Sequence, residues 1–185
     1  MQTSETLTMN RQDPLFILET ERLWLRRIQM DDVEFLVELW TDSDVTRYAG
    51  GPRDKDWLRN LLEETAQNPF AEKYDLWMTL EKAGGQRVGH VGLLEKEIEG
   101  AIEYDYGYFL MPSFWGRGYA TEICKAVMHY GREVLGLRRM VAMIDPMNAA
   151  SQNVALKLGM KLEREMMRPG TIPRRMYSIN FDDSH

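Results

Sequence analysis

The sequence contains little cysteine, no long apolar run and no excess of positive charge, and each shortage excludes a class of protein. Cys124 is the only cysteine among 185 residues, so the chain cannot form an internal disulfide. The first ten residues lack the charged start and apolar run of a signal peptide, and no segment reaches about 18 consecutive apolar residues. We therefore expect a cytoplasmic protein that is neither exported nor inserted into a membrane.

The charge balance also limits the partners. Acidic residues outnumber basic residues by 29 to 23, which gives a formal net charge of −6. Nucleic acids and anionic membranes are bound by clustered Lys and Arg that neutralise phosphates. The sequence therefore predicts no nucleic-acid partner and no membrane partner, and it leaves a basic partner or plain solubility as alternatives.

Composition is typical of a soluble globular protein, with 44% hydrophobic and 28% charged residues. A chain of this length can bury a core without metals or disulfides, and we assign no metal-binding residue. No repeat, low-complexity tract or linker divides it. We expect a single domain over residues 1–185, in which residues 1–13 form a flexible N-terminal segment.

The order of apolar patterns predicts an α/β protein in which two helices precede the main part of a largely antiparallel sheet. Apolar residues at helical spacing predict helices over 33–40, 54–67, 123–136 and 149–158. Alternating and short apolar runs predict strands over 20–27, 74–80, 88–94, 101–111 and 139–144. A closing hairpin is expected over 160–167 and 175–181, around Gly170 and Pro173. Along 101–111 the alternation places Glu103 and Asp105 on one face.

The most informative stretch is SFWGRGYATE at 113–122, where a strand gives way to glycines that open directly into a helix. Glycines let an anion approach the backbone, and a helix start offers unpaired N–H groups, so the stretch suits a diphosphate. A tight turn would look the same from the glycines alone. A dinucleotide fold is disfavoured because Thr121 stands where G-x-G-x-x-G needs its last glycine, and the Walker lysine is absent.

Two segments together resemble the GNAT acetyltransferase superfamily. WGRGYA at 115–120 resembles its Q/R-x-x-G-x-G/A pyrophosphate loop, with Trp115 in place of the usual Gln or Arg. The later segment from Asn148 through Ser151 to Gly159 and Met160 resembles its N-x-x-S-x-x-x-x-x-x-x-G-F/M segment. An early ERL-LR strand, Gly107-Tyr108 and GRGYATE resemble the branch that includes ribosomal-protein N-terminal acetyltransferases.

The resemblance implies a GNAT fold with a mixed sheet of about six or seven strands and about four helices, in which strands 102–111 and 139–144 splay apart at the cofactor site. It implies acetyl-CoA as co-substrate, with the pantetheine arm in the split and backbone contacts at Phe109 and Met111. The other cofactor-binding residues that it implies are Trp115, Gly116, Arg117, Gly118, Tyr119, Ala120, Thr121, Asn148 and Ser151.

Transfer to an amine requires a neutral nucleophile, because a protonated amine has no lone pair, so a nearby carboxylate or an ordered water must accept a proton. Asp105 is our first candidate for this role and Glu103 the second, although two carboxylates on a strand can equally be solvated or ion-paired. His90 on the neighbouring strand is a weaker candidate.

The departing thiolate also needs a proton or a hydrogen bond. Many members of the superfamily use a tyrosine in the second helix of the site, where this chain has Ala155. The resemblance implies Ser151 as the substitute acid and Asn148 as a cofactor ligand. Both residues would also suit an ordinary helix start.

The resemblance therefore predicts an acetyl-CoA-dependent N-acetyltransferase that acts on a primary amine, with a protein or peptide N-terminus as the favoured acceptor. A small-molecule amine acetyltransferase acting on a polyamine, amino acid or amine antibiotic is one alternative, and a non-catalytic acetyl-CoA-binding regulator is another. Trp40, Trp57 and Tyr48 are candidates for the acceptor site. The oligomeric state stays open, with a homodimer as one option.

Overall fold

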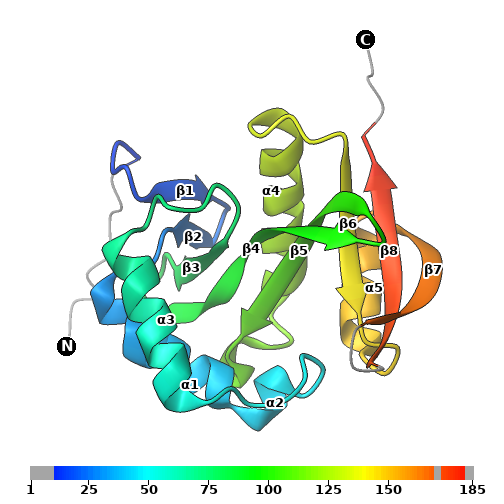
Figure 1. Cartoon of the computed structure of the whole chain (residues 1–185). Helices are drawn as coiled ribbons and strands as arrows, with labels where there is room; N and C mark the ends of the chain where they lie inside the picture. The colour runs from blue at the N-terminus through cyan, green and yellow to red at the C-terminus, as the bar shows by residue number, and fades with distance from the viewer. Residues whose placement is uncertain (1–10, 169–171, 182–185) are drawn as a thin grey trace.

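A computed structural model of the chain describes residues 11–168 and 172–181 (Figure 1). Within these residues, eight strands form one sheet in the order β1-β2-β3-β4-β5-β6-β8-β7. The strands are β1 Phe16–Glu19, β2 Leu23–Arg26, β3 Leu76–Glu81, β4 Arg87–Ile98, β5 Ala101–Leu110, β6 Arg139–Ile144, β7 Lys161–Arg168 and β8 Ile172–Asn180. The helices are α1 Val33–Thr41, α2 Ser43–Thr46, α3 Lys55–Gln67, α4 Tyr119–Glu133 and α5 Ala149–Lys157, with 3₁₀ turns η1 Met30–Asp32 and η2 Pro112–Phe114.

The mixed, largely antiparallel sheet predicted from the sequence is confirmed, with more strands than expected because β1 pairs with β2. The two expected early helices are joined by short α2, which begins where Asp42 accepts hydrogen bonds from the N–H groups of Asp44 and Val45. The closing hairpin is also present. Its expected turn residue Gly170 and most of the expected N-terminal segment 1–13 lie outside the described residues. Among the described residues, no helix combines the length and apolar character required to span a bilayer.

Helices cover both faces of the sheet (Figure 1). On one face, Leu23 and Leu25 of β2 share a core with Ile123 and Val127 of α4. On the other face, Trp24 of β2 packs in a second core with residues of α1 and α3. The alternation of side chains along a strand produces this division. It leaves β5 and β6 between the two helical layers, where the site lies.

The strand pair β5 and β6 is the one parallel pair in the described sheet, and the two strands are in register only at Asp105 and Val141. Beyond this point the strands diverge, and β6 pairs with β8 along its full length. The Asp105 carboxylate accepts a hydrogen bond from the N–H of Met143 at 3.1 Å. It thereby satisfies a backbone donor next to the divergence. The predicted splayed pair is confirmed.

A buried ion network fixes the start of the helical arm. Asp32 lies directly before α1, but its fully buried carboxylate makes no capping hydrogen bond to this helix. It binds Arg26 (2.5 and 2.9 Å) and Arg87 (2.8 Å) and accepts the N–H of Gln29. Burial opposes its ionisation, but the hydrogen bonds from Arg26 and Arg87 outweigh burial and hold the pKa of Asp32 below its usual range.

Because the native pKa of Asp32 lies below the unfolded value, its carboxylate stabilises the fold above about pH 4 and loses this effect as the pH falls through the native pKa. We predict that Asp32→Asn lowers the free energy of unfolding at pH 7 by about 3 kcal/mol, because it leaves buried guanidinium groups without their anion. The difference from the parent chain should shrink in acid, as measured by urea denaturation across pH.

Asp31→Asn is the matched control, since Asp31 bonds the same Arg87 but its side chain is 69% exposed. Its cost should be below about 1 kcal/mol. Equal costs for the two variants would contradict the assignment of Asp32 as the centre of the network.

Candidate active site

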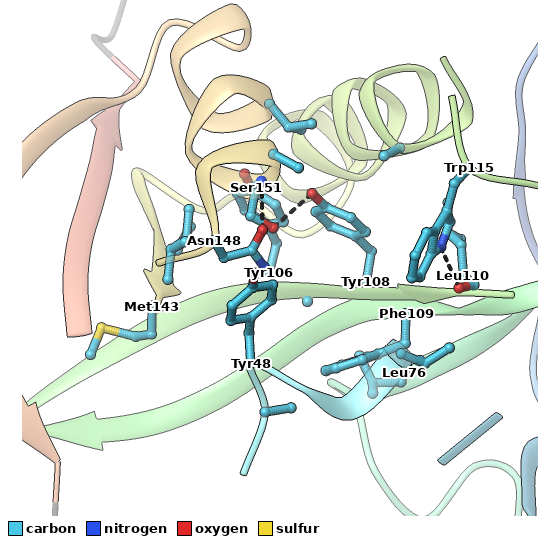
Figure 2. A pocket seen from close by; sticks show the side chains of 18 of the residues that line it. Tyr48, Leu76, Tyr106, Tyr108, Phe109, Leu110, Trp115, Met143, Asn148 and Ser151 are labelled. Atoms are coloured by element: carbon cyan, nitrogen blue, oxygen red, sulfur yellow. Dashed lines mark hydrogen bonds between the residues drawn. The ribbon is translucent and has the colours of Figure 1, made fainter. Parts of the chain in front are cut away.

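A cavity of about 730 Å³ lies at the divergence of β5 and β6 (Figure 2). Its wall combines the α1–α2 arm, β5, β6, the loop after β5 and one face of α5. The α5 residues on this wall are Ala150, Ser151, Val154 and Lys157, whose spacing places them on one face of the helix. The cavity therefore connects the glycine loop with the helical arm.

The glycine loop presents open backbone donors. Gly116 and Gly118 adopt positive φ angles of 73° and 80°, and α4 begins directly afterwards at Tyr119. In the part of the chain that the structure describes, the N–H groups of residues 117–121 donate to no protein acceptor. Residues 118–121 line the cavity. Free N–H groups at a helix start, with glycines beside them, suit a diphosphate.

Two side chains hold this loop, Trp115 from the predicted site and Arg22, which the sequence did not single out. The Trp115 indole donates to the carbonyl oxygen of Leu110 at 2.7 Å, which ties the loop to the end of β5 (Figure 2). Arg22 donates to the carbonyl of Arg117 at 3.0 Å and binds Glu122. The early ERL segment and the GRGYATE segment thus contact each other. Trp115 departs from the usual residue of the loop, and this hydrogen bond gives that departure a structural role.

The hydrogen-bond pattern between β4 and β5 determines which backbone groups of β5 can contact a pantetheine arm. The N–H of Met111 donates to Val88 on β4 at 3.0 Å, and its carbonyl accepts from Phe114, so Met111 is engaged and does not line the cavity. The register between β4 and β5 is continuous, so Phe109 faces β4 in the same way. The expected backbone contacts at Phe109 and Met111 therefore do not fit. The backbone groups that face the split belong to Tyr108 and Leu110.

The two carboxylates on β5 have different surroundings. Asp105 lines the cavity and binds the ammonium of Lys96 at 2.5 Å, in addition to the N–H of Met143. Glu103 lies away from the cavity, where it binds Arg139 at 2.9 and 3.1 Å. The two carboxylates therefore share a face of β5 but differ in what lies beside them. Of the two, only Asp105 can contact a molecule in the cavity.

His90 is enclosed by protein. Its Nδ1 accepts from the Trp40 indole at 3.1 Å, so Nε2 carries the proton that it donates to the carbonyl of Leu76 at 3.0 Å. Burial lowers the pKa of His90 to about 4. This histidine is neutral and both of its ring nitrogens are already hydrogen-bonded, so it does not suit the role of a base.

Three hydroxyl groups surround the start of α5. Asn148 caps the helix by accepting the N–H of Ser151 at 3.1 Å, and the Ser151 hydroxyl lies 2.8 Å from the phenol of Tyr108 (Figure 2). The phenol of Tyr106 is buried and has no hydrogen-bond partner among the described residues, although Tyr106 lines the cavity. Such an orphaned donor, together with the open N–H groups, fits a ligand that carries amide and phosphate groups.

The helical arm supplies the other end of the cavity. Trp40 packs against Phe109 with a centroid distance of 4.1 Å and the ring planes tilted by 42°. Tyr48 reaches toward Asn148 from the segment after α2 (Figure 2). The buried guanidinium of Arg174 joins the carbonyl of Tyr48 to Asp145. Trp57, the third aromatic predicted for this end, is 57% exposed and is absent from the cavity wall.

The charges on the wall are mostly positive. They comprise Asp44, Asp105, Arg53, Lys96, Lys157 and Arg174. Both carboxylates are ion-paired, Asp44 with Arg47 and Asp105 with Lys96. The Lys157 ammonium forms no hydrogen bond or ion pair with the described part of the chain, so its charge is available to an anion at this wall. The acidic groove that would suit a strongly basic peptide is therefore not found on the described wall.

Comparison with known proteins links this geometry to a family. Residues 22–161 match the family described as acetyltransferase (GNAT) domain. The chain is 32% identical over 152 residues to the uncharacterized protein YkkB of Bacillus subtilis, covering 82% of this chain and 88% of that protein. It is 31% identical over 178 residues to the uncharacterized N-acetyltransferase YoaA of the same organism (88% and 96%). It is 25% identical over 154 residues to the spermidine N(1)-acetyltransferase of Escherichia coli (77% and 75%).

Solved structures share the fold. An acetyltransferase (GNAT family) from Bacillus anthracis superposes with a TM-score of 0.74 at 27% identity, covering 89% of this chain and 98% of that one. A putative ribosomal-protein-serine acetyltransferase from Vibrio cholerae superposes with a TM-score of 0.70 at 22% identity (90% and 98%). At this lower identity the second likeness concerns the fold alone.

The open N–H groups give a direct test. We predict that Gly118→Val weakens binding of CoA by at least about tenfold, because a β-branched residue at φ 80° forces the backbone to rotate and turns these donors away. Binding can be measured by titration calorimetry.

Gly136→Val is the control, since Gly136 has a φ of 69° just after the same helix but does not line the cavity. Its thermal stability should fall while CoA affinity stays within about twofold of the parent. Equal loss of affinity in both variants would contradict a cradle at Gly118.

Proposed function

The chain belongs to the GNAT acetyltransferase family and takes its acetyl group from acetyl-CoA, and on that premise we propose that it acetylates a single primary amine, foremost the N-terminus of a protein or peptide. The observation that carries the proposal is a single cavity with two chemically different ends. Open N–H groups lie at the start of α4, aromatic rings lie at the helical arm, and the Asp105 carboxylate lines the wall where β5 and β6 diverge.

Acetyl-CoA supplies an acetyl group activated as a thioester, and the chain's own residues bind, orient and handle protons. Residues 116–121 and Lys157 are assigned to the anionic end. The backbone of Tyr108 and the N–H of Leu110 are assigned to the arm that enters the split, since the Leu110 carbonyl is bound by Trp115. A backbone N–H on this part of β5 would hydrogen-bond the thioester carbonyl and stabilise negative charge that develops on its oxygen.

Asp105 is assigned to the acceptor amine. The amine arrives protonated and must lose a proton before its lone pair can attack. Asp105 is the cavity-lining carboxylate on β5, and its contact with the Lys96 ammonium supports the assignment, because Lys96 is itself a primary ammonium group. An incoming amine would compete with Lys96 for this carboxylate and transfer its proton there or to a water that it orders.

The charges favour one amine over several. A polyamine carries several ammonium groups, each of which gains from a free carboxylate, whereas the carboxylates of this wall are already paired and Arg53, Lys96 and Arg174 lie nearby. An α-amino group titrates near pH 8, well below a lysine side chain, so more of it is neutral at pH 7. An α-amino group therefore requires less proton transfer to Asp105 or to an ordered water than a lysine side chain does.

We predict that Asp105→Asn lowers kcat/KM for the amine by about 100-fold or more, the usual contribution of a positioned proton acceptor. The affinity for CoA should change little. Glu103→Gln, on the same strand face but away from the cavity, should retain turnover once any loss of stability from its broken pair with Arg139 is controlled by thermal denaturation. A larger effect at Glu103 than at Asp105 would contradict this assignment.

The acceptor is tested by thiol release with a panel of amines. Peptides with a free N-terminus should exceed spermidine by about tenfold or more in kcat/KM, and N-terminal blocking should abolish turnover. Spermidine or an amine antibiotic as the best substrate would support the small-molecule alternative. Bound acetyl-CoA without turnover of any amine would support the regulator.

A further inference from the structure

The hydroxyl pair formed by Tyr108 and Ser151 lies where two elements distant in sequence meet. Tyr108 comes from β5 and Ser151 from the first turn of α5, and their oxygens are 2.8 Å apart. Both residues line the cavity, and Figure 2 shows their side chains pointing toward each other above the strand. The pair therefore combines a hydrogen bond within the protein with access to the cavity.

Two hydroxyl groups carry two protons, and the hydrogen bond between them uses only one. The second O–H remains available to an acceptor in the cavity, whichever oxygen donates. Ser151 also has its backbone N–H bound to Asn148 at 3.1 Å, which fixes the position of its side chain. The pair is thus a preoriented donor rather than a freely rotating serine hydroxyl.

The position at which many members of the superfamily carry a tyrosine cannot provide this donor. Ala155 is completely buried in the core against α4 and is not part of the cavity wall. The hydroxyl groups on the wall near the start of α5 include those of Tyr108 on β5 and Ser151.

We propose that Tyr108 is a positioning residue for the leaving group: its phenol O–H donates to Ser151, so that the Ser151 O–H points at the departing sulfur. The inference rests on the proposed function. In the transfer step the acceptor nitrogen bonds to the acetyl carbon, the carbon–sulfur bond breaks and its electron pair goes to sulfur. The hydroxyl hydrogen-bonds this thiolate, and the proton lost by the amine balances the one that the thiol finally takes up.

The surroundings of Tyr108 keep the phenol in its donor form. Burial raises its pKa above the usual value, against a smaller opposite effect of the hydrogen bond with Ser151. The charged groups on the cavity wall nearest in sequence to the pair are Asp105 on β5 and Lys157 on α5. Asp105 is neutralised by Lys96, so no unpaired carboxylate on the described wall competes for the hydroxyl proton.

The test compares Tyr108→Phe with the parent chain through the thiol of bound CoA, whose thiolate is titrated by its ultraviolet absorbance. A hydrogen bond to the thiolate lowers the thiol pKa, so the pKa of bound CoA should rise by about one unit in Tyr108→Phe. With a turned-over amine, kcat should fall roughly 10- to 100-fold while the KM for acetyl-CoA changes little.

Tyr177→Phe is the matched control. Tyr177 also donates its phenol to a side chain of α5, Gln152 at 3.0 Å, but it does not line the cavity. Its loss should leave the thiol pKa and kcat as in the parent chain. An equal shift of the thiol pKa in Tyr177→Phe and Tyr108→Phe would mean that the Tyr108 hydrogen bond only helps to hold α5 in place. That result would overturn the proposal.

A double-mutant cycle tests whether Tyr108 acts through Ser151. Because the Tyr108 phenol is assigned no contact other than Ser151, Tyr108→Phe should add less than about twofold to the effect of Ser151→Ala. Additive effects, or an unchanged thiol pKa in Tyr108→Phe, would overturn the proposal. The thiol titration needs no acceptor amine. A chain that binds CoA but turns over no amine would refute the proposed function, and the titration would still test the role of Tyr108.

Discussion

The divergence of β5 and β6 beyond Asp105 is the constraint on which the site depends. A continued parallel ladder would pair the backbone groups of both strands and close the space between them. Divergence frees those groups, which must then find other partners. The Asp105 carboxylate takes the N–H of Met143, and the Trp115 indole takes the carbonyl of Leu110, so each strand is capped by a side chain where the ladder ends.

The same side chains link this split to the chemistry. Asp105 satisfies the backbone of β6, holds Lys96 and faces the cavity, so its structural and proposed catalytic roles compete for the same oxygens. Asn148 similarly caps α5 and thereby fixes Ser151. The structural reading and the functional reading of these residues are therefore compatible, because a hydrogen bond that stabilises the fold also positions the donor beside it.

Sequence patterns predicted most of the fold because they are local: the glycines before α4, the apolar spacing of α4 and the alternation in β5. What they missed depends on pairing between distant segments. The one-residue difference between Phe109 and Tyr108 follows from the register of β4 against β5, which alternation cannot give. Tyr108 and Ser151 are 43 residues apart, and Lys96 reaches Asp105 across a hairpin. Alternation places Glu103 and Asp105 on one face, and only their different partners, Arg139 and Lys96, distinguish them.

The central claim is that the open N–H groups of residues 117–121 and the backbone of β5 beside the split receive CoA. Backbone amide chemical shifts recorded during a titration with CoA test it most directly, because they report on each donor separately. The largest changes are expected at Gly118, Tyr119 and Ala120, followed by Tyr108 and Leu110. Saturation with CoA that leaves these amides unchanged and shifts those of another surface would contradict the claim.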